Sequence, residues 1–198
     1  MLASGVIGLE PRTRNPGIDN GSSFLRALLE AGLIDTEIFA IKFSKSVEDH
    51  SSKITFGGYD AELVGDNQIS WEPLMAGNER WKIKLSKMLY GDKNLGIKEG
   101  VNDWILITTG ESRVRMYRSV FLGMENDLKS KFNEKCYNAD SSFYCVVEDK
   151  SLSKFERLEI HLSTTTIYVD PVDYVKFVSL ISNCRLKTQN QKSLELYF

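Results

Sequence analysis

The sequence lacks a long run of apolar residues. No segment approaches the roughly 18 consecutive apolar residues of a membrane-spanning helix, which excludes a membrane span. The first residues, Met1–Gly5, also lack the charged start and apolar run of a signal peptide. Taken literally, the chain would stay in the cytosol. If it is instead an internal piece of a longer product whose signal has been lost, its compartment is unknown.

The sequence is also poor in histidine, cysteine and excess charge. His50 and His161 are too few and too far apart to imply a metal site, and the three cysteines have no Cys-x-x-Cys spacing. We therefore expect no metal and no other cofactor. The net charge of -2 creates no basic field that would attract nucleic acid.

What the chain does contain is a series of short segments typical of β-strands. Its 42% of hydrophobic residues is ordinary for a globular protein, and its 11% of aromatic residues favours strands. The residue patterns predict strands over residues 37–44, 53–56, 68–74 and 81–88, a hairpin of 158–162 with 165–169, and helices over 24–31 and 119–132. We therefore expect a mainly β fold with a few short helices.

The most informative segment is Ile105–Ser112, I-L-I-T-T-G-E-S. Three apolar residues typical of a strand lead into a Thr-Thr-Gly turn. The segment resembles the active-site strand and loop of pepsin-like aspartic peptidases, in which a catalytic aspartate stands at the position of Thr108. By this resemblance, Thr109 and Gly110 keep the loop's scaffold, since the threonine supplies hydroxyl hydrogen bonds and the glycine permits the tight backbone.

Other segments resemble landmarks of the same family, in the family's order. They are Gly5–Leu9, Phe24–Ser44, the Phe-Gly-Gly-x-Asp hairpin at Ile54–Asp60, Trp71–Leu74 with Trp81–Ile83, and Leu158–Leu162 with Ile167–Val175. Each motif is weak alone, but their order and spacing together are not. The resemblance covers most of residues 5–175 and fades after Val175.

The resemblance implies the pepsin-like acid-protease fold, with its second (C-terminal) lobe and the tail of its first lobe. We expect residues 1–44 to be a remnant of the N-terminal lobe, 45–85 to supply inter-lobe strands, and 86–198 to form a C-terminal lobe that is incomplete at its end. In this family, each lobe braces its active-site loop against an apolar-apolar-Gly segment. Here Val6–Gly8 resembles the first lobe's brace without its loop, and Ile105–Gly110 resembles the second lobe's loop without its brace, which indicates truncation at both ends. A parent of this family would be secretory, lysosomal or vacuolar.

The family hydrolyses peptide bonds in peptide or protein substrates with two aspartates that share one proton. The sequence contains no Asp-Thr-Gly, and the hydroxyl of Thr108 cannot replace a carboxylate. We expect Glu111 to be a solvated surface residue rather than a substitute. The chain is therefore predicted to be a member or fragment of the family that is itself catalytically inactive. The alternative is a non-catalytic pseudo-peptidase that binds peptides or a protein partner.

The three cysteines, Cys136, Cys145 and Cys184, leave two alternatives open. In a cytosolic fragment we expect reduced thiols. In a secretory parent, the resemblance implies a disulfide between Cys145 and Cys184, with Cys136 left over.

Two further groups of residues have ordinary structural explanations. Arg113, Arg115 and Arg118 follow the loop, and we expect a solvated basic edge rather than a groove for acidic ligands. Trp71, Trp81 and Trp104 are predicted to lie in the core. Because parts of both lobes are expected to be missing, we also predict exposed apolar surface and a poorly stable chain.

Overall fold

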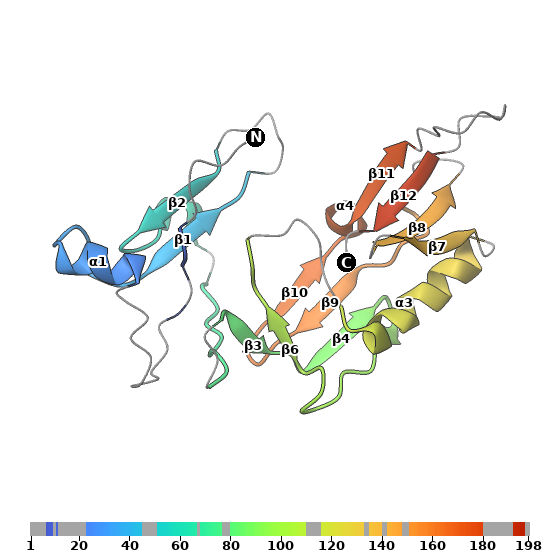
Figure 1. The fold of residues 1–198 in the computed structure, drawn as a ribbon, viewed down its shortest axis with the longest axis horizontal. Helices are drawn as coiled ribbons and strands as arrows, with labels where there is room; N and C mark the ends of the chain where they lie inside the picture. The colour runs from blue at the N-terminus through green and yellow to red at the C-terminus, as the bar shows by residue number, and fades with distance from the viewer. Residues whose placement is uncertain are drawn as a thin grey trace. The chain divides into compact units, whose positions relative to one another are not determined.

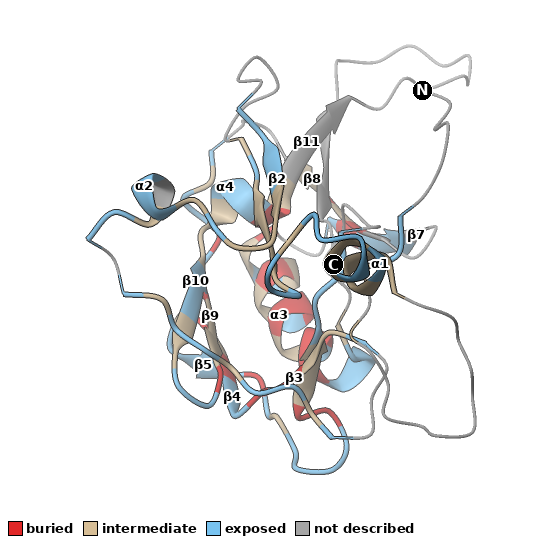
Figure 2. Ribbon diagram, turned by 90° about the vertical axis from the view of Figure 1, so that its left-hand side faces the viewer, coloured by how far each residue is buried: buried red, intermediate tan, exposed pale blue. Residues whose placement is uncertain are grey.

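The computed structural model describes residues 7–9, 11, 23–44, 51–66, 68–76, 80–109, 116–132, 135–139, 142–147, 151–179 and 192–196. The chain separates into two compact units. Unit 1 comprises Met1–Trp71 and Ala76–Trp81, and unit 2 comprises Glu72–Met75 and Lys82–Phe198. Figure 1 labels most of the helices and strands of both units along the chain, and Figure 2 labels α2 and β5.

Unit 1 contains α1 (Phe24–Glu30), β1 (Phe39–Lys42), β2 (Lys53–Phe56) and α2 (Ala61–Val64) (Figure 1). Helix α1 begins where the sequence predicts because the side-chain oxygen of Ser23 accepts a hydrogen bond from the Arg26 N–H at 3.3 Å. It ends at Glu30. Gly32 follows with φ of 67°, a left-handed conformation that glycine adopts without steric cost.

Strands β1 and β2 form an antiparallel pair with Phe39 opposite Phe56, which confirms both predicted strands. Aromatic contacts join this hairpin to the rest of unit 1. Phe56 meets Phe24 at 5.3 Å between ring centroids, and Phe39 meets Trp81 at 5.4 Å. Even so, no residue of unit 1 whose burial is described is buried. Two strands and two short helices do not enclose a core.

Unit 2 contains antiparallel sheets and two helices. Strand β3 (Lys82–Lys84) pairs with β6 (Trp104–Leu106). One four-stranded sheet has the order β10 (Thr166–Val169), β9 (Leu158–His161), β4 (Lys87–Tyr90), β5 (Lys93–Asn94). The other has the order β11 (Val175–Ser179), β12 (Lys192–Leu196), β8 (Ser142–Val147), β7 (Cys136–Ala139). The helices are α3 (Arg118–Lys131) and α4 (Pro171–Tyr174).

The core of unit 2 forms around α3. Val120, Met124 and Leu128 recur at helical spacing and are 3%, 0% and 0% exposed, so they form the buried apolar face of the predicted helix. Phe121 of the same helix meets Phe143 of β8 at 5.2 Å between ring centroids. Figure 2 shows buried segments on α3 and near β3 and β4. Helix α3 therefore packs against strands such as β8, and their apolar residues complete the core.

The predicted mainly β fold with a few short helices is confirmed, as is the hairpin now seen as β9 and β10. Two predicted strands are wrong. Residues 68–74 form no strand, and Leu74 makes only an isolated bridge with Ile83. Residues 81–88 divide into β3 and β4, because the Leu85 N–H bonds to Asp103 O, just before β6, whereas the Ser86 N–H bonds to His161 O on β9. Trp71, expected in the core, is 69% exposed.

Candidate functional site

The segment that contains the Thr-Thr-Gly turn, Ile105–Ser112, begins on strand β6, and this strand is anchored in the core. Ile105 lies opposite the buried Ile83 of β3 and packs against the core of unit 2. The turn before β6 is buried as well. Asn102 is 1% exposed, and its Oδ1 accepts a hydrogen bond from the Lys98 N–H at 2.6 Å. A buried and satisfied polar side chain holds this turn in one conformation, and so sets where the strand begins.

Past Leu106 the chain leaves the sheet and becomes exposed. Ile107 is 53% exposed, and Thr108 and Thr109 are exposed too. Residues 110–112 lie outside the described part of the chain, so the roles expected of that glycine and glutamate stay predictions. Thr108 therefore lies just past the exposed end of β6, a strand whose beginning is fixed in the core.

An aromatic and basic cluster flanks β6. The rings of Trp104 and Tyr117 meet edge to face, with their centroids 5.6 Å apart. Lys82 places its Nζ 4.1 Å from the centroid of the Trp104 ring. The ring quadrupole attracts this cation, so the cluster stabilises the pairing of β3 with β6. Trp104 is partly buried and Tyr117 is 39% exposed, which places the cluster at the surface of unit 2.

Both buried acidic side chains of the described residues are paired with basic groups. Asp103 lies 4.0 Å from Lys84 Nζ. Glu125 lies 2.6 Å from Arg118 and 3.0 Å from Lys129. Burial raises the pKa of Glu125, but the contacts with Lys129 and Arg118 outweigh burial and hold that pKa below its ordinary value. A carboxylate kept ionised in this way cannot act as the protonated member of an acid pair.

The remaining candidate side chains have structural partners or lie outside the described residues. Arg118 is exposed, as predicted, but it also forms an ion pair with the buried Glu125. His161 places Nδ1 3.2 Å from Thr166 Oγ1 and Nε2 3.3 Å from Glu159. Three candidates fall outside the described part of the chain: His50, Arg113 and Arg115. Within the described ranges, no group of three or more His, Cys, Asp or Glu side chains could hold a metal ion.

The described cysteines form a disulfide that the sequence did not predict. Cys136 on β7 and Cys145 on β8 lie directly opposite each other, with Cα atoms 4.0 Å apart, and are joined by a disulfide. The bridge replaces the predicted Cys145–Cys184 pairing, because the hairpin register places the two side chains on one face and a sulfur forms only one such bond. Cys184 lies outside the described residues. The separation of 9 residues is the sequence signal that could have indicated this hairpin bridge.

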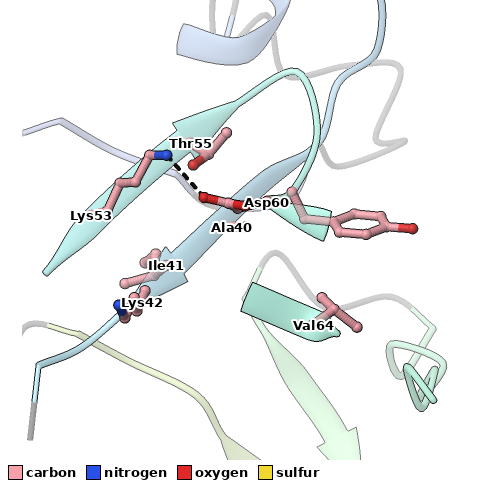
Figure 3. Close-up of a pocket in the computed structure, with 8 residues that line it drawn as sticks. Ala40, Ile41, Lys42, Lys53, Thr55, Asp60 and Val64 are labelled. Atoms are coloured by element: carbon pink, nitrogen blue, oxygen red, sulfur yellow. Dashed lines mark hydrogen bonds and ion pairs between the residues drawn. The ribbon is translucent and has the colours of Figure 1, made fainter. Parts of the chain in front are cut away.

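A pocket of about 300 Å³ lies in unit 1, lined by residues of β1 and β2 and by residues of and before α2 (Figure 3). Lys53 Nζ reaches across it to Asp60 Oδ2 at 3.1 Å. Asp60 also accepts a hydrogen bond from the Glu62 N–H at 3.2 Å. No residue predicted to act in catalysis lines the pocket. Its only sequence signal is the Phe-Gly-Gly-x-Asp motif, which ends at Asp60.

Comparison with known proteins gives one informative result. A family model described as eukaryotic aspartyl protease matches residues 2–197. The match spans both units and continues past Val175, where the sequence landmarks end. A search of curated proteins finds no match. Among the described residues, no helix has the length and apolar character needed to cross a membrane.

Proposed function

Because the chain belongs to the eukaryotic aspartyl protease family, we propose that it is a non-catalytic member of a family of hydrolases that act on peptides or proteins. Thr108 carries this proposal. It stands where the family resemblance implies the second catalytic aspartate, on the exposed segment just past β6. A threonine hydroxyl stays protonated, so it cannot share a proton with a second acid or draw one from water. One carboxylate of the pair would be missing whatever else completed the site.

The lobe assignment is part of the same proposal. Residues 1–44 would belong to the N-terminal lobe, 45–85 to the inter-lobe strands and 86–198 to the C-terminal lobe. The position of the buried core supports this assignment, since the buried apolar residues of the described chain, apart from Ile83 and Leu85, all lie between Met88 and Tyr174. The loop that contains Thr108 would then belong to the C-terminal lobe. It lies in unit 2, the unit in which the described residues form a buried core.

The proposal is tested by haemoglobin digestion at acid pH, with and without a statine-type inhibitor. We expect no inhibitor-sensitive digestion by the purified chain. Thr108→Asp should also be inactive, because the sequence supplies no Asp-Thr-Gly for its partner. Digestion that co-purifies with the wild-type chain and is blocked by the inhibitor would overturn the proposal.

A second candidate function is peptide binding without cleavage, favoured by the apolar surface around the loop. Ile107 is 53% exposed and Tyr117 is 39% exposed on the two segments that flank it. If a peptide covers Ile107, Ile107→Ser should weaken calorimetrically measured binding of an apolar statine-type peptide roughly fivefold or more. Val172→Ser is the matched control, since Val172 is also an exposed aliphatic residue, at 69%. Equal affinities of the two variants would contradict peptide binding at this loop.

A further inference from the structure

The turn between β9 and β10 holds a carboxylate from a distant part of the same chain. Oε1 of Glu72 accepts hydrogen bonds from the Thr164 N–H at 2.7 Å and the Thr165 N–H at 3.0 Å. Oε2 accepts one from the Ser163 N–H at 3.2 Å. The Thr164 hydroxyl donates a fourth, at 2.8 Å to Oε1. All four donors belong to consecutive residues, and all converge on one side chain.

The backbone of the turn is held in shape by other bonds. The Leu162 N–H donates to Thr165 O at 2.8 Å and closes the hairpin. The Ser86 hydroxyl shares its one proton between His161 O at 2.9 Å and Leu162 O at 3.1 Å. The successive N–H groups of Ser163–Thr165 all donate to the Glu72 carboxylate. Successive N–H groups in a turn form a concave site for anions.

Glu72 is the first residue of the short segment Glu72–Met75, where the chain enters unit 2. The other end of this segment is tied to β3, since Leu74 bridges to Ile83 and the Met75 N–H donates to Lys82 O at 2.9 Å. Pro73 has no N–H to contribute. The carboxylate of Glu72 therefore attaches the first residue of this segment to the β9–β10 turn.

We propose that residues 163–165 are a carboxylate-binding turn whose occupant is Glu72, and that this contact fastens segment 72–75 to the β9–β10 hairpin while the carboxylate is ionised. Protonation converts one acceptor oxygen into an O–H donor that faces an N–H donor, and it removes the negative charge that strengthens the other bonds, so the contact weakens. The turn thereby acts as an acid-released clamp within unit 2.

The titration of Glu72 agrees with this geometry. Partial burial raises the pKa of Glu72, but the hydrogen bonds from Thr164, Thr165 and Ser163 outweigh burial and place that pKa below its ordinary value. The clamp is therefore complete above the ordinary glutamate pKa of about 4.3. It is lost as the pH falls through the lower pKa of the folded state.

The neighbouring strands carry five other ionisable side chains: Glu159 and His161 on β9, Lys82 and Lys84 on β3, and Lys87 on β4. Most of them have partners of their own. Glu159 and His161 face each other at 3.3 Å, Lys82 lies over the Trp104 ring, and Lys84 pairs with Glu99 and Asp103. His161 is the other ionisable group of β9 beside Glu159, so a variant that removes its imidazole tests whether it contributes to the pH dependence of the turn.

The first test asks whether the turn binds a carboxylate when Glu72 is removed. In Glu72→Ala, formate should produce saturable shifts of the amide resonances of residues 163–165 in ¹⁵N NMR spectra. The wild-type chain and Glu62→Ala, which loses an exposed carboxylate on α2, should show no such response. A folded Glu72→Ala variant whose turn ignores formate would overturn the proposal. An equal response in the wild-type chain would overturn it too.

The second test does not depend on the folding of Glu72→Ala. In the wild-type chain, hydrogen-exchange protection of the Thr164 and Thr165 amides should fall severalfold between about pH 6 and about pH 3. Glu72→Gln should show weak protection at both pH values, because the amide group adds donors that face the turn. His161→Asn should behave like the wild-type chain. Protection that stays constant with pH in the wild-type chain would refute the clamp.

Discussion

Arg118 and Glu125 are joined along one face of α3, with Arg118 Nη1 2.6 Å from Glu125 Oε2. The arginine side chain is 60% exposed, whereas the glutamate side chain is 2% exposed. Oε2 has no hydrogen-bond partner among the described residues, so this contact is an ion pair. Lys129 at 3.0 Å and Asn138 at 3.2 Å bind the other oxygen. A buried carboxylate is thus stabilised by cations that themselves remain near solvent.

Glu125→Gln should flatten the dependence of stability on pH. The pKa of Glu125 is lowered in the folded state, so its ion pairs stabilise the fold above the ordinary glutamate pKa and this stabilisation is lost as the pH falls. We expect the variant to lose about 1–3 kcal/mol of unfolding free energy near neutral pH and less at about pH 3. Urea unfolding at the two pH values measures both quantities.

The control for this prediction is Glu99→Gln, because Glu99 pairs with Lys84 but its side chain is 86% exposed. Exposed pairs contribute little, so this variant should follow the wild-type pH dependence. If both variants lose the same amount at both pH values, the buried ion pair has no special role.

Gly57→Ala should loosen the β1–β2 hairpin, whereas Gly58→Ala should not. Gly57 has φ of 81°, and an added Cβ would lie 3.0 Å from Ile34 Cβ. Gly58 has open space within 4 Å. An alanine in the left-handed conformation costs about 1–2 kcal/mol. The N–H of residue 57 donates to Ile38 O at 2.8 Å, so its protection against hydrogen exchange should fall roughly tenfold. Hydrogen exchange measures this, and equal protection in both variants would argue against the strain.

Tryptic mapping without reduction should find the disulfide inside one peptide. Cleavage after Lys135 and Lys150 leaves Cys136 and Cys145 together in residues 136–150. The oxidised peptide should be two hydrogens lighter than its reduced form. The closed loop is short, so reduction should lower the unfolding free energy by about 2–3 kcal/mol. A linked pair of peptides that contains Cys145 and Cys184 would instead restore the pairing implied by the family resemblance.

Units 1 and 2 should differ in stability. Unit 1 has no buried residue among those whose burial is described, whereas unit 2 encloses side chains such as Met124 and Leu128 at 0% exposure. Amides of β1 and β2 should therefore exchange much faster than those of α3. Hydrogen exchange followed by mass spectrometry resolves the two. A sharp, reversible melt of the whole chain, with equal protection in both units, would contradict this expectation.

The elements that the sequence predicts well depend on residues close together in the chain. The Ser23 cap and Gly32 set the ends of α1, and a helical period of apolar residues sets the buried face of α3. The candidate site is predicted only in part. The apolar run before Thr108 does form a strand, but its anchoring by the buried Asn102 carries no recognisable signal in the sequence.

The sequence by itself determined the strand-rich architecture, the family and the threonine at the site of an expected catalytic acid, because these follow from local order along the chain. Only the tertiary structure decided that Cys145 bonds to Cys136, that Glu125 is buried among cations, and that Glu72 binds a turn more than ninety residues away. Those contacts depend on strand register and on how distant segments pack, and both are set by the free energy of the whole fold rather than by any short stretch of residues.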